Sequence, residues 1–280
     1  MMPTTRIYAK NAAYQKLEVL KTNRNKRHRY GEFLVEGVRN INEAIANGWE
    51  IRTFVHGDPV GLSGWALERL RDVPTGGNLQ LSSELMGEIS GKTDTSELLA
   101  IVAMRRANQP DLARLSPNPL IALFDRPSNK GNLGTALRSC DALGVDMLLL
   151  TGHCVDLYDP ETVQASMGSL FRAPAWHIPD NAGVDDLLFR LSERCAPCPL
   201  AVVGSSADAS LDIFDCDLTG PTVLLLGNEA DGLCQHLREV CTVMARIPMA
   251  PKAGADSLNV ACAATALFCE AVRQRRSDRT

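Results

Sequence analysis

The C-terminal two thirds of the chain alternate between short apolar runs and longer amphipathic stretches. Runs such as LIALF (residues 120–124) and TVLLLG (222–227) are almost entirely apolar, as expected of strands that are buried on both faces. Between such runs, apolar residues at helical spacing predict helices, one that ends at Gly144 and a long one from Leu258 to about Arg276. The pattern therefore predicts an α/β fold with a mostly parallel sheet covered by helices on both sides.

The N-terminal third has its own mixed pattern of strands and helices. FLVEG (33–37) and IRTFVH (51–56) predict strands, the stretch between them predicts a helix closed by Gly48, and a further helix is predicted within residues 11–24. The segment 105–119 is polar and proline-rich with no strong period, which is typical of a linker. We therefore predict a basic N-terminal helix or arm (1–30), a smaller α/β domain (31–106), a linker (107–118) and a larger α/β domain (119–280).

The charge is distributed unevenly along the chain. The formal net charge of −4, with 22% charged and 45% hydrophobic residues, is ordinary for a soluble globular protein and argues against a surface uniformly coated with positive charge. Up to Tyr30, however, many lysines and arginines are opposed by Glu18 alone. A basic segment joined to an acidic body predicts a polyanionic partner, and a solvated, flexible tail is the alternative. The predicted phosphate-binding residues are Arg24, Lys26, Arg27 and Arg29.

Apolar run length and cysteine spacing exclude some classes of protein. The longest apolar runs are too short to span a bilayer and the start of the chain is polar, so we expect a cytoplasmic protein without a membrane partner. Nine cysteines in a chain of this length do not indicate a disulfide scaffold, and Cys262 and Cys269 fit core positions. Cys195 and Cys198 have the spacing of half a zinc or redox site, but no second pair completes it. We therefore expect no metal.

Three apolar runs end at residues suited to tight turns and polar contacts. We call the segments at or after the ends of these predicted strands the strand exits. They read NLGTALR (132–138), LLLGNEADGL (224–233) and IPMAPKAGADSLNV (247–260). Parallel α/β proteins build ligand sites at the carboxyl ends of their strands, so the three exits predict one composite site. The first exit alone resembles a dinucleotide-binding turn, but the G-x-G-x-x-G pattern is incomplete, which disfavours a nucleotide-dependent oxidoreductase.

Taken in order, the three motifs resemble the SpoU/TrmH family of the SPOUT superfamily, which are RNA ribose 2′-O-methyltransferases. The resemblance rests on N-x-G-x-x-x-R, GNE, and IPM followed by SLNV, and it covers about residues 120–276. The stretch GEFLVEGVRNINEAIANG resembles the start of the L30e-like substrate-binding domain that precedes it in many members. The matching residues are Asn132, Gly134 and Arg138 in the first motif, Gly227, Asn228 and Glu229 in the second, and Ser257, Leu258, Asn259 and Val260 in the third.

The resemblance implies a SPOUT domain with a deep trefoil knot, S-adenosylmethionine as cofactor, and a homodimer in which two protomers complete the site. Because a separate substrate domain is present, ribosomal RNA is a better expectation than transfer RNA. The residues expected to act in catalysis are Arg138, Asn132, Glu229, Ser257 and Asn259, and those expected to bind the cofactor are Gly227, Asn228, Ile247, Met249 and Leu258.

Physical chemistry limits the role of the arginine. A guanidinium group with a pKa above about 12 stays protonated, so Arg138 is expected to orient the ribose or a phosphate and to stabilise negative charge rather than to act as a neutral base. Asn132 and Ser257 each precede a predicted helix, so helix capping is an alternative role for both. A noncatalytic RNA-binding protein that keeps the same fold is the alternative function, and the intact set of motif residues argues against it. The loop APKAGAD, with Lys252, is longer than in many relatives and has no assigned role.

Overall fold

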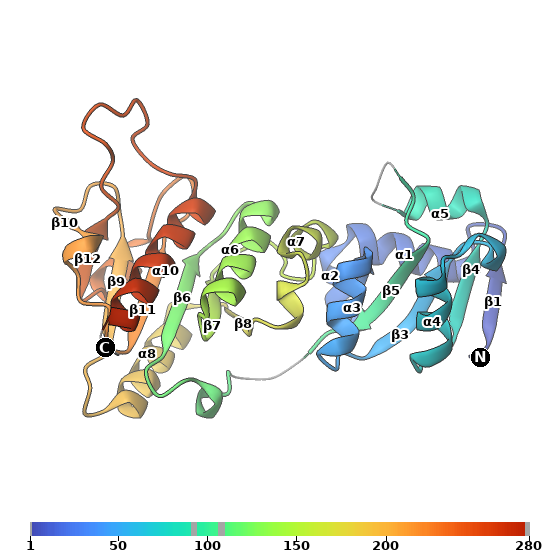
Figure 1. The fold of residues 1–280 in the computed structure, drawn as a ribbon, viewed down its shortest axis with the longest axis horizontal. Coiled ribbons are helices and arrows are strands. Elements are labelled where there is room, and N and C mark those ends of the chain that lie inside the picture. The colour runs from blue at the N-terminus through green and yellow to red at the C-terminus, as the bar shows by residue number, and fades with distance from the viewer. Residues whose placement is uncertain (1, 91–93, 106–109, 278–280) are drawn as a thin grey trace. The chain divides into compact units, whose positions relative to one another are not determined.

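The computed structural model describes residues 2–90, 94–105 and 110–277, and the chain divides into two compact units. Unit 1 comprises Met1–Ala107 and Asp156–Arg172, and unit 2 comprises Asn108–Val155 and Ala173–Thr280 (Figure 1). The segment Asp156–Arg172 falls inside the larger domain predicted from the sequence, yet it packs within unit 1. Hydrophobic periodicity does not reveal such an excursion, because it reports local structure and not the partner of a buried face.

Unit 1 is built on a five-stranded sheet with the order β1-β4-β3-β5-β2. The strand β5 pairs antiparallel with β2 and β3, whereas β4 pairs parallel with β1 and β3. Its strands are β1 (Thr4–Ile7), β2 (Glu32–Glu36), β3 (Ile51–His56), β4 (Asn78–Leu81) and β5 (Leu98–Ala103). Its helices are α1 (Ala12–Thr22), α2 (Arg24–Tyr30), α3 (Val38–Ala46), α4 (Gly64–Asp72), α5 (Ser83–Ile89) and α7 (Pro160–Ser166), with short 3-10 turns at Pro59–Gly61 and Ser169–Phe171.

The basic N-terminal segment is part of the folded unit and not a free tail. The strand β1, which the sequence pattern did not predict, forms an edge of the sheet beside β4. On α1, Tyr14, Leu17 and Leu20 are fully buried in the core of unit 1. The flexible-tail alternative is therefore wrong, because a segment that buries this much apolar surface is held in place by it.

Arg27 is the exception among the four basic residues expected to contact phosphate. Its side chain on α2 is 1% exposed, and its guanidinium donates to Asp156 at 2.8 Å and to Asp159 at 3.0 Å. Further donors of the same group reach the carbonyl oxygens of Leu20 and Lys21. A phosphate cannot reach this group, so Arg27 anchors Asp156–Arg172 within unit 1, and its expected role in RNA binding is corrected to a structural one.

Unit 2 is built on a seven-stranded sheet with the order β10-β12-β9-β11-β6-β7-β8, in which every pair is parallel. Its strands are β6 (Leu120–Asp125), β7 (Met147–Thr151), β8 (Ala175–Ile178), β9 (Ala201–Ser205), β10 (Leu211–Asp212), β11 (Thr222–Leu226) and β12 (Val243–Arg246). Its helices are α6 (Lys130–Leu143), α8 (Asn181–Cys195), α9 (Gln235–Glu239) and α10 (Val260–Ser277), with 3-10 turns at Leu112–Arg114 and Ile213–Asp215.

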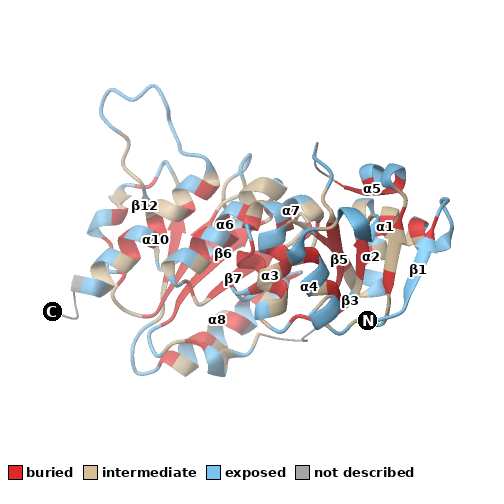
Figure 2. Ribbon diagram, turned by 45° about the vertical axis from the view of Figure 1, so that its right-hand side comes forward, coloured by how far each residue is buried: buried red, intermediate tan, exposed pale blue. Residues whose placement is uncertain are grey.

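The seven-stranded sheet is buried on both faces, as the apolar runs predict. Residues such as Ile121 and Val223 form one core cluster with Leu187 of α8. The alternate residues Phe124 and Leu224 are also fully buried, on the face covered by α6 and α10 (Figures 1 and 2). These two helices pack against each other, with the hydroxyls of Ser139 and Thr265 2.7 Å apart. The predicted α/β class with a parallel sheet is confirmed.

Two helix starts differ from the expected ones. Asn129, and not Asn132, caps α6, because its side chain accepts from the backbone N–H of Asn132 at 2.9 Å. Asn259, and not Ser257, caps α10, because its side chain accepts from the N–H of Ala261 at 2.9 Å. The side chain of Asn132 is thus available for other contacts.

Other expectations fall partly outside the described residues or are corrected. Residues 106–109, which include the first three residues of the predicted linker (107–118), are not described, and the rest of the linker contains a 3-10 turn followed by Leu115, which is buried in the core of unit 2. Cys262 and Cys269 on α10 are exposed, so their assignment to the core is wrong. Among the described residues, no helix is both long and apolar enough to cross a membrane.

Candidate active site

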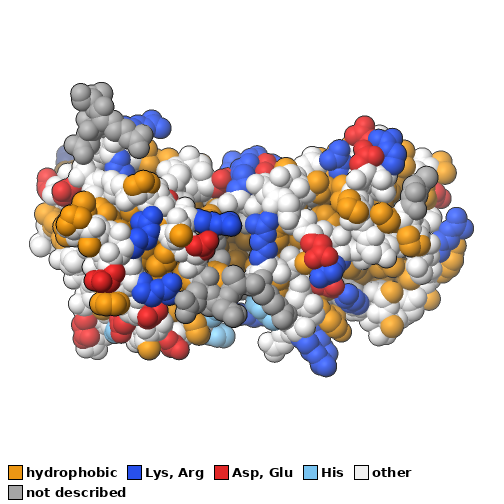
Figure 3. Space-filling model, turned by 90° about the horizontal axis from the view of Figure 1, so that it is seen from below, with side chains coloured by type: hydrophobic (Ala, Val, Ile, Leu, Met, Phe, Trp, Pro, Cys, Tyr) orange, Lys and Arg blue, Asp and Glu red, His pale blue; other side chains and the backbone are white. Residues whose placement is uncertain are grey.

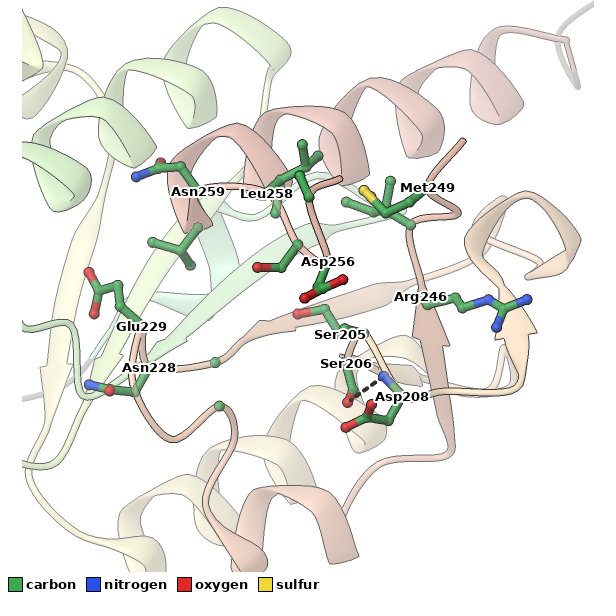
Figure 4. Close-up of a pocket in the computed structure, with 18 of the residues that line it drawn as sticks. Ser205, Ser206, Asp208, Asn228, Glu229, Arg246, Met249, Asp256, Leu258 and Asn259 are labelled. Carbon is green, nitrogen blue, oxygen red and sulfur yellow. Dashed lines mark hydrogen bonds between the residues drawn. The ribbon is translucent and has the colours of Figure 1, made fainter. Parts of the chain in front are cut away.

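A cavity of about 1320 Å³ lies at the carboxyl ends of the strands in unit 2 (Figure 4). Its walls come from the residues that follow β9, β11 and β12 and from the start of α6. In Figure 4, Asn228, Glu229 and Asn259 lie at one end of this cavity, and Arg246 and Met249 lie at the other. The three strand exits singled out in the sequence therefore meet at one site, as the rule for parallel sheets predicts.

The structure brings most of the predicted site residues to this cavity. Asn132, Glu229, Ser257 and Asn259 of the expected catalytic set line the cavity, as do Gly227, Asn228, Ile247, Met249 and Leu258 of the expected cofactor set. Arg138 does not line it. This arginine is exposed on α6, and no hydrogen bond or ion pair of its side chain is seen within the described part of the chain.

Three motif residues form a hydrogen-bonded set at one end of the cavity. The Asn132 amide donates to Glu229 at 3.1 Å, and the Asn259 amide donates to the Asn132 carbonyl oxygen at 3.0 Å. The other carboxylate oxygen of Glu229 accepts from the hydroxyl and the backbone N–H of Ser128. Side chains from three distant stretches thus fix one another, and the amide of Asn132 is oriented by a charged acceptor.

The protonation state of Glu229 follows from these contacts. Burial alone would raise the pKa of its carboxyl, but hydrogen bonds from Asn132, its own backbone N–H and Ser128 outweigh burial and lower the pKa. Glu229 is therefore ionised at neutral pH and acts as an acceptor that holds its neighbours, not as an acid that gives up a proton.

Gly227 is required by the shape of its own loop. A Cβ atom at this position would lie 2.7 Å from the Cα of Gly232, because the chain turns back and pairs Asn228 with Gly232 through two hydrogen bonds of 3.0 Å. Gly232 itself has a φ of +67°, in the left-handed region that favours glycine. The GNE motif is thus a tight hairpin whose backbone faces the cavity.

Apolar side chains line the cavity beside this polar end. Ile247 and Met249 are partly exposed, and Leu258 is 42% exposed. Leu258 is therefore not an ordinary core residue, because a core leucine would be almost completely buried. These side chains offer apolar contacts to a ligand in the cavity.

Sequence reasoning missed several residues that also line the cavity. A fourth strand exit, Ser205–Asp208 at the end of β9, forms part of its wall together with Arg246 and Asp256 (Figure 4). The polar run SSAD directly after the apolar run AVVG was the available signal, of the same kind as the three exits that were recognised. Ser128 and Asn129 were missed because they lie just before the first motif.

The remaining predicted residues lie elsewhere. Arg24 and Lys26 are half-buried and Arg29 is exposed on α2 of unit 1, next to the buried Arg27. Cys195 is buried and Cys198 is exposed, and within the described residues no group of histidine, cysteine or acidic side chains has the arrangement of a metal site.

Two family models match the sequence of this chain. The sequence model of the SpoU rRNA methylase family matches residues 119–269, and that of the SpoU L30e-like domain matches residues 11–100. The chain therefore belongs to the SpoU rRNA methylase family, which confirms the resemblance carried by the three motifs.

Individual relatives agree with this assignment. The chain is 44% identical to a 23S rRNA (uridine(2479)-2′-O)-methyltransferase of Streptomyces viridochromogenes, over 98% of this chain and 94% of the relative. It is 29% identical to the 23S rRNA (guanosine-2′-O-)-methyltransferase RlmB of Haemophilus ducreyi, over 69% and 76% of the two chains. The crystal structure of the S. viridochromogenes SpoU methyltransferase AviRb in complex with AdoMet matches with a TM-score of 0.87 at 43% identity, over 95% of this chain and 99% of that one.

Proposed function

We propose that this chain transfers a methyl group from S-adenosylmethionine to a ribose 2′-hydroxyl of ribosomal RNA. One observation carries the proposal: Asn132, Glu229 and Asn259 form a hydrogen-bonded set at the end of a cavity that the family's motif residues enclose. The two relatives described above are named as 23S rRNA 2′-O-methyltransferases, which supports ribosomal RNA over transfer RNA.

The residues of the cavity fit S-adenosylmethionine. Ile247, Met249 and Leu258 offer apolar contacts to an adenine ring, and the hairpin after Gly227 presents backbone groups. The carboxylates of Glu229 and Asp256 also line the cavity and favour a positively charged sulfonium. We therefore assign Gly227, Asn228, Ile247, Met249 and Leu258 to cofactor binding.

The cofactor supplies a methyl group on a positively charged sulfur, so its leaving group is neutral and needs no acid or metal. The protein has to orient the 2′-hydroxyl and stabilise its oxygen as the proton departs. Asn132 and Asn259 orient the nucleotide, Glu229 holds Asn132, and Ser257 contributes a hydroxyl at the cavity wall. The Arg138 guanidinium donates to the 2′-oxygen and stabilises the negative charge that develops there as the hydroxyl proton passes to an RNA phosphate while the C–O bond forms.

The direct test is methyl transfer to ribosomal RNA isolated from cells that lack the gene. With S-adenosylmethionine labelled in the methyl group, we expect label in the large ribosomal RNA at one ribose, located by reverse-transcription stops at low nucleotide concentration. A label on a base would contradict the proposed reaction. Binding of both S-adenosylmethionine and RNA without any transfer would instead support the alternative of a noncatalytic RNA-binding protein.

Arg24, Lys26 and Arg29 are proposed to contact RNA phosphates from α2. On the face of the molecule in Figure 3, acidic and basic side chains are interspersed, which matches the net charge of −4. This mixture favours a small local phosphate-binding surface over a broad basic one. A ribosomal RNA substrate also supports the proposal of a cytoplasmic protein.

A homodimer and a deep trefoil knot complete the proposal. Arg138 is exposed on α6, outside the cavity of its own chain, and α6 packs against α10. Because Arg138 does not reach the cavity of its own chain, we propose that the surface formed by α6 and α10 is the dimer interface. The Arg138 of one copy would then complete the active site of the other. Membership of the SpoU rRNA methylase family supports the proposed knot, in which the C-terminal segment would thread through a loop of the sheet.

Two native cysteines make the proposed dimer surface testable. Cys262 and Cys269 are exposed on α10 and, seven residues apart, lie on one side of the helix. If this surface is the dimer interface, both thiols should be protected from a maleimide in the native protein at micromolar concentration. Cys198, which is exposed three residues beyond the end of α8, should react at once and serves as the internal control. Mass spectrometry of the digested protein measures all three.

Substitutions at the interface cysteines and at an exposed cysteine elsewhere test whether this surface forms the dimer. Cys262→Glu together with Cys269→Glu should give a monomer in light scattering, because paired carboxylates in a buried interface are costly. Cys198→Glu should remain a dimer. A dimer in which Cys262 and Cys269 both react as fast as Cys198 would exclude this surface.

A further inference from the structure

The residue that follows β6 has an unusual backbone conformation. Arg126 has a φ of +44° and is one of two residues other than glycine with a positive φ among those described. A bulky residue in this region of backbone conformation is strained, and the surrounding contacts must offset that strain. Arg126 lies two residues before Ser128, which donates a hydrogen bond to Glu229. The unusual backbone conformation is therefore close to the active site in the chain.

Arg126 holds the GNE hairpin at both of its ends. Its backbone carbonyl accepts from the Asn228 side-chain amide at 2.6 Å, and its guanidinium donates to the Gly232 carbonyl at 3.3 Å. Asn228 and Gly232 are the two residues that pair with each other across the hairpin. The left-handed backbone and the side chain of one residue thus fix the hairpin together.

A buried carboxylate anchors the guanidinium. Asp125 is 1% exposed and accepts two hydrogen bonds from Arg126, at 3.1 and 3.0 Å. It also accepts from the Thr151 hydroxyl at the end of β7 and from the backbone N–H of Cys234, just past the hairpin, both at 2.8 Å. Burial alone would raise the pKa of this carboxyl, but Arg126, the Cys234 N–H and Thr151 together lower it. The ionised Asp125 at the end of β6 therefore links the end of β7, through Thr151, to the hairpin, through Arg126 and Cys234.

The neighbouring strand exit leaves space for the arginine side chain. Gly152, directly after β7, has a φ of +56°, and a Cβ atom there would lie 3.0 Å from the Cγ of Arg126. Any larger residue would press on the stem of the arginine. The hairpin Asn228–Gly232 and the segment at Gly152 thus both contact the Arg126 side chain, although Arg126 does not itself line the cavity.

We propose that Arg126 is a positioning residue for methyl transfer, which holds the hairpin Asn228–Gly232 so that Glu229 stays within reach of Asn132 and Ser128. This inference rests on the proposed function of the same site. Arg126 acts through the hairpin, and the cavity wall formed by Gly227 and Asn228 depends on it. Loss of the guanidinium should therefore weaken cofactor binding as well as turnover.

Arg126→Gly and Arg126→Ala separate the backbone from the side chain. Both variants lose the guanidinium, but only glycine adopts a positive φ without strain, so the glycine variant should have the higher melting temperature of the two. We expect the Kd of S-adenosylmethionine, measured by calorimetry without RNA, to rise about tenfold in both variants, because both lose the hydrogen bond from the guanidinium to Gly232. Arg190→Ala, on α8 and away from the cavity wall, is the matched control and should leave the Kd unchanged.

A second measurement keeps the test valid if one variant folds poorly. Gly152→Ala displaces the Arg126 stem without removing it and should also raise the Kd, and amide exchange of Asn228–Gly232 should become faster in the unliganded protein. In a double-mutant cycle, Gly152→Ala should raise the Kd less in the Arg126→Gly background than in the native chain. Lower melting temperatures with unchanged Kd and exchange rates, or additive effects in the cycle, would reduce Arg126 to a structural residue. Native protein that does not bind S-adenosylmethionine would contradict the proposed function instead.

Discussion

Arg138→Ala should lower kcat for methyl transfer by about 100- to 1000-fold, the effect of removing one preorganised donor from a developing oxyanion. The cofactor should still bind with a Kd within about twofold of the native value, because Arg138 does not line the cavity that we assign to S-adenosylmethionine. The expected loss therefore falls on turnover and not on cofactor binding. Single-turnover kinetics with ribosomal RNA and calorimetry with the cofactor measure the two quantities separately.

Two further variants define what Arg138 contributes. Arg138→Lys keeps the positive charge but loses the planar fork of donors, so we expect a kcat between those of the native chain and Arg138→Ala. Arg114→Ala removes an arginine that is 87% exposed in unit 2 and does not line the cavity, and it should leave kcat unchanged. Undiminished turnover in Arg138→Ala would remove this residue from the mechanism, and loss of cofactor binding would show that its role is structural.

The mixed-subunit experiment addresses where Arg138 acts. If a second copy completes the site, inactive Arg138→Ala and inactive Asn132→Ala chains should regain activity when they are mixed and allowed to exchange subunits. In such a heterodimer, one of the two sites has both native residues. Failure to regain activity, with heterodimers verified by mass, would place Arg138 in the site of its own chain.

Much of the site was predictable because it is local in sequence. Asn228, Glu229 and Asn259 belong to short motifs at strand ends, and in a parallel sheet all such ends meet at one edge. Buried strands such as β6 and β11 were likewise predictable, since a strand covered on both faces is apolar throughout. The exit Ser205–Asp208 carried the same kind of signal as the three motifs and was missed only because it matched no recognised pattern.

Other features depend on contacts that no local pattern encodes. Arg27 lies in a run of basic residues, and only its two partners, Asp156 and Asp159, make it a buried ion pair. The positive φ of Arg126 has no sequence signature, because glycine is the residue that usually marks such a conformation. Such features come from packing between segments that are far apart in the chain, and they have to be read from the structure.

Neutralising the basic residues of α2 should weaken RNA binding in a way that depends on salt. In the triple variant Arg24→Gln, Lys26→Gln and Arg29→Gln, we expect the slope of log K against log salt concentration to become shallower by about 2, since each phosphate contact to unpaired RNA contributes roughly 0.7. Affinity at low salt should fall by one to two orders of magnitude and differ little at high salt. Filter binding of a ribosomal RNA fragment over a range of salt concentrations measures both.

The control variants distinguish RNA contact from total charge and from folding. Lys10, Arg52 and Arg71 are exposed residues of unit 1 outside α2, so changing all three to Gln removes the same charge and should leave the slope nearly unchanged. Arg27→Met should instead lower the free energy of unfolding by about 3–5 kcal/mol, because Asp156 and Asp159 lose their buried partner. At temperatures where that variant remains folded, its salt slope should equal that of the native chain. Equal slopes in the α2 triple variant and the native chain would exclude this helix from the RNA-binding surface.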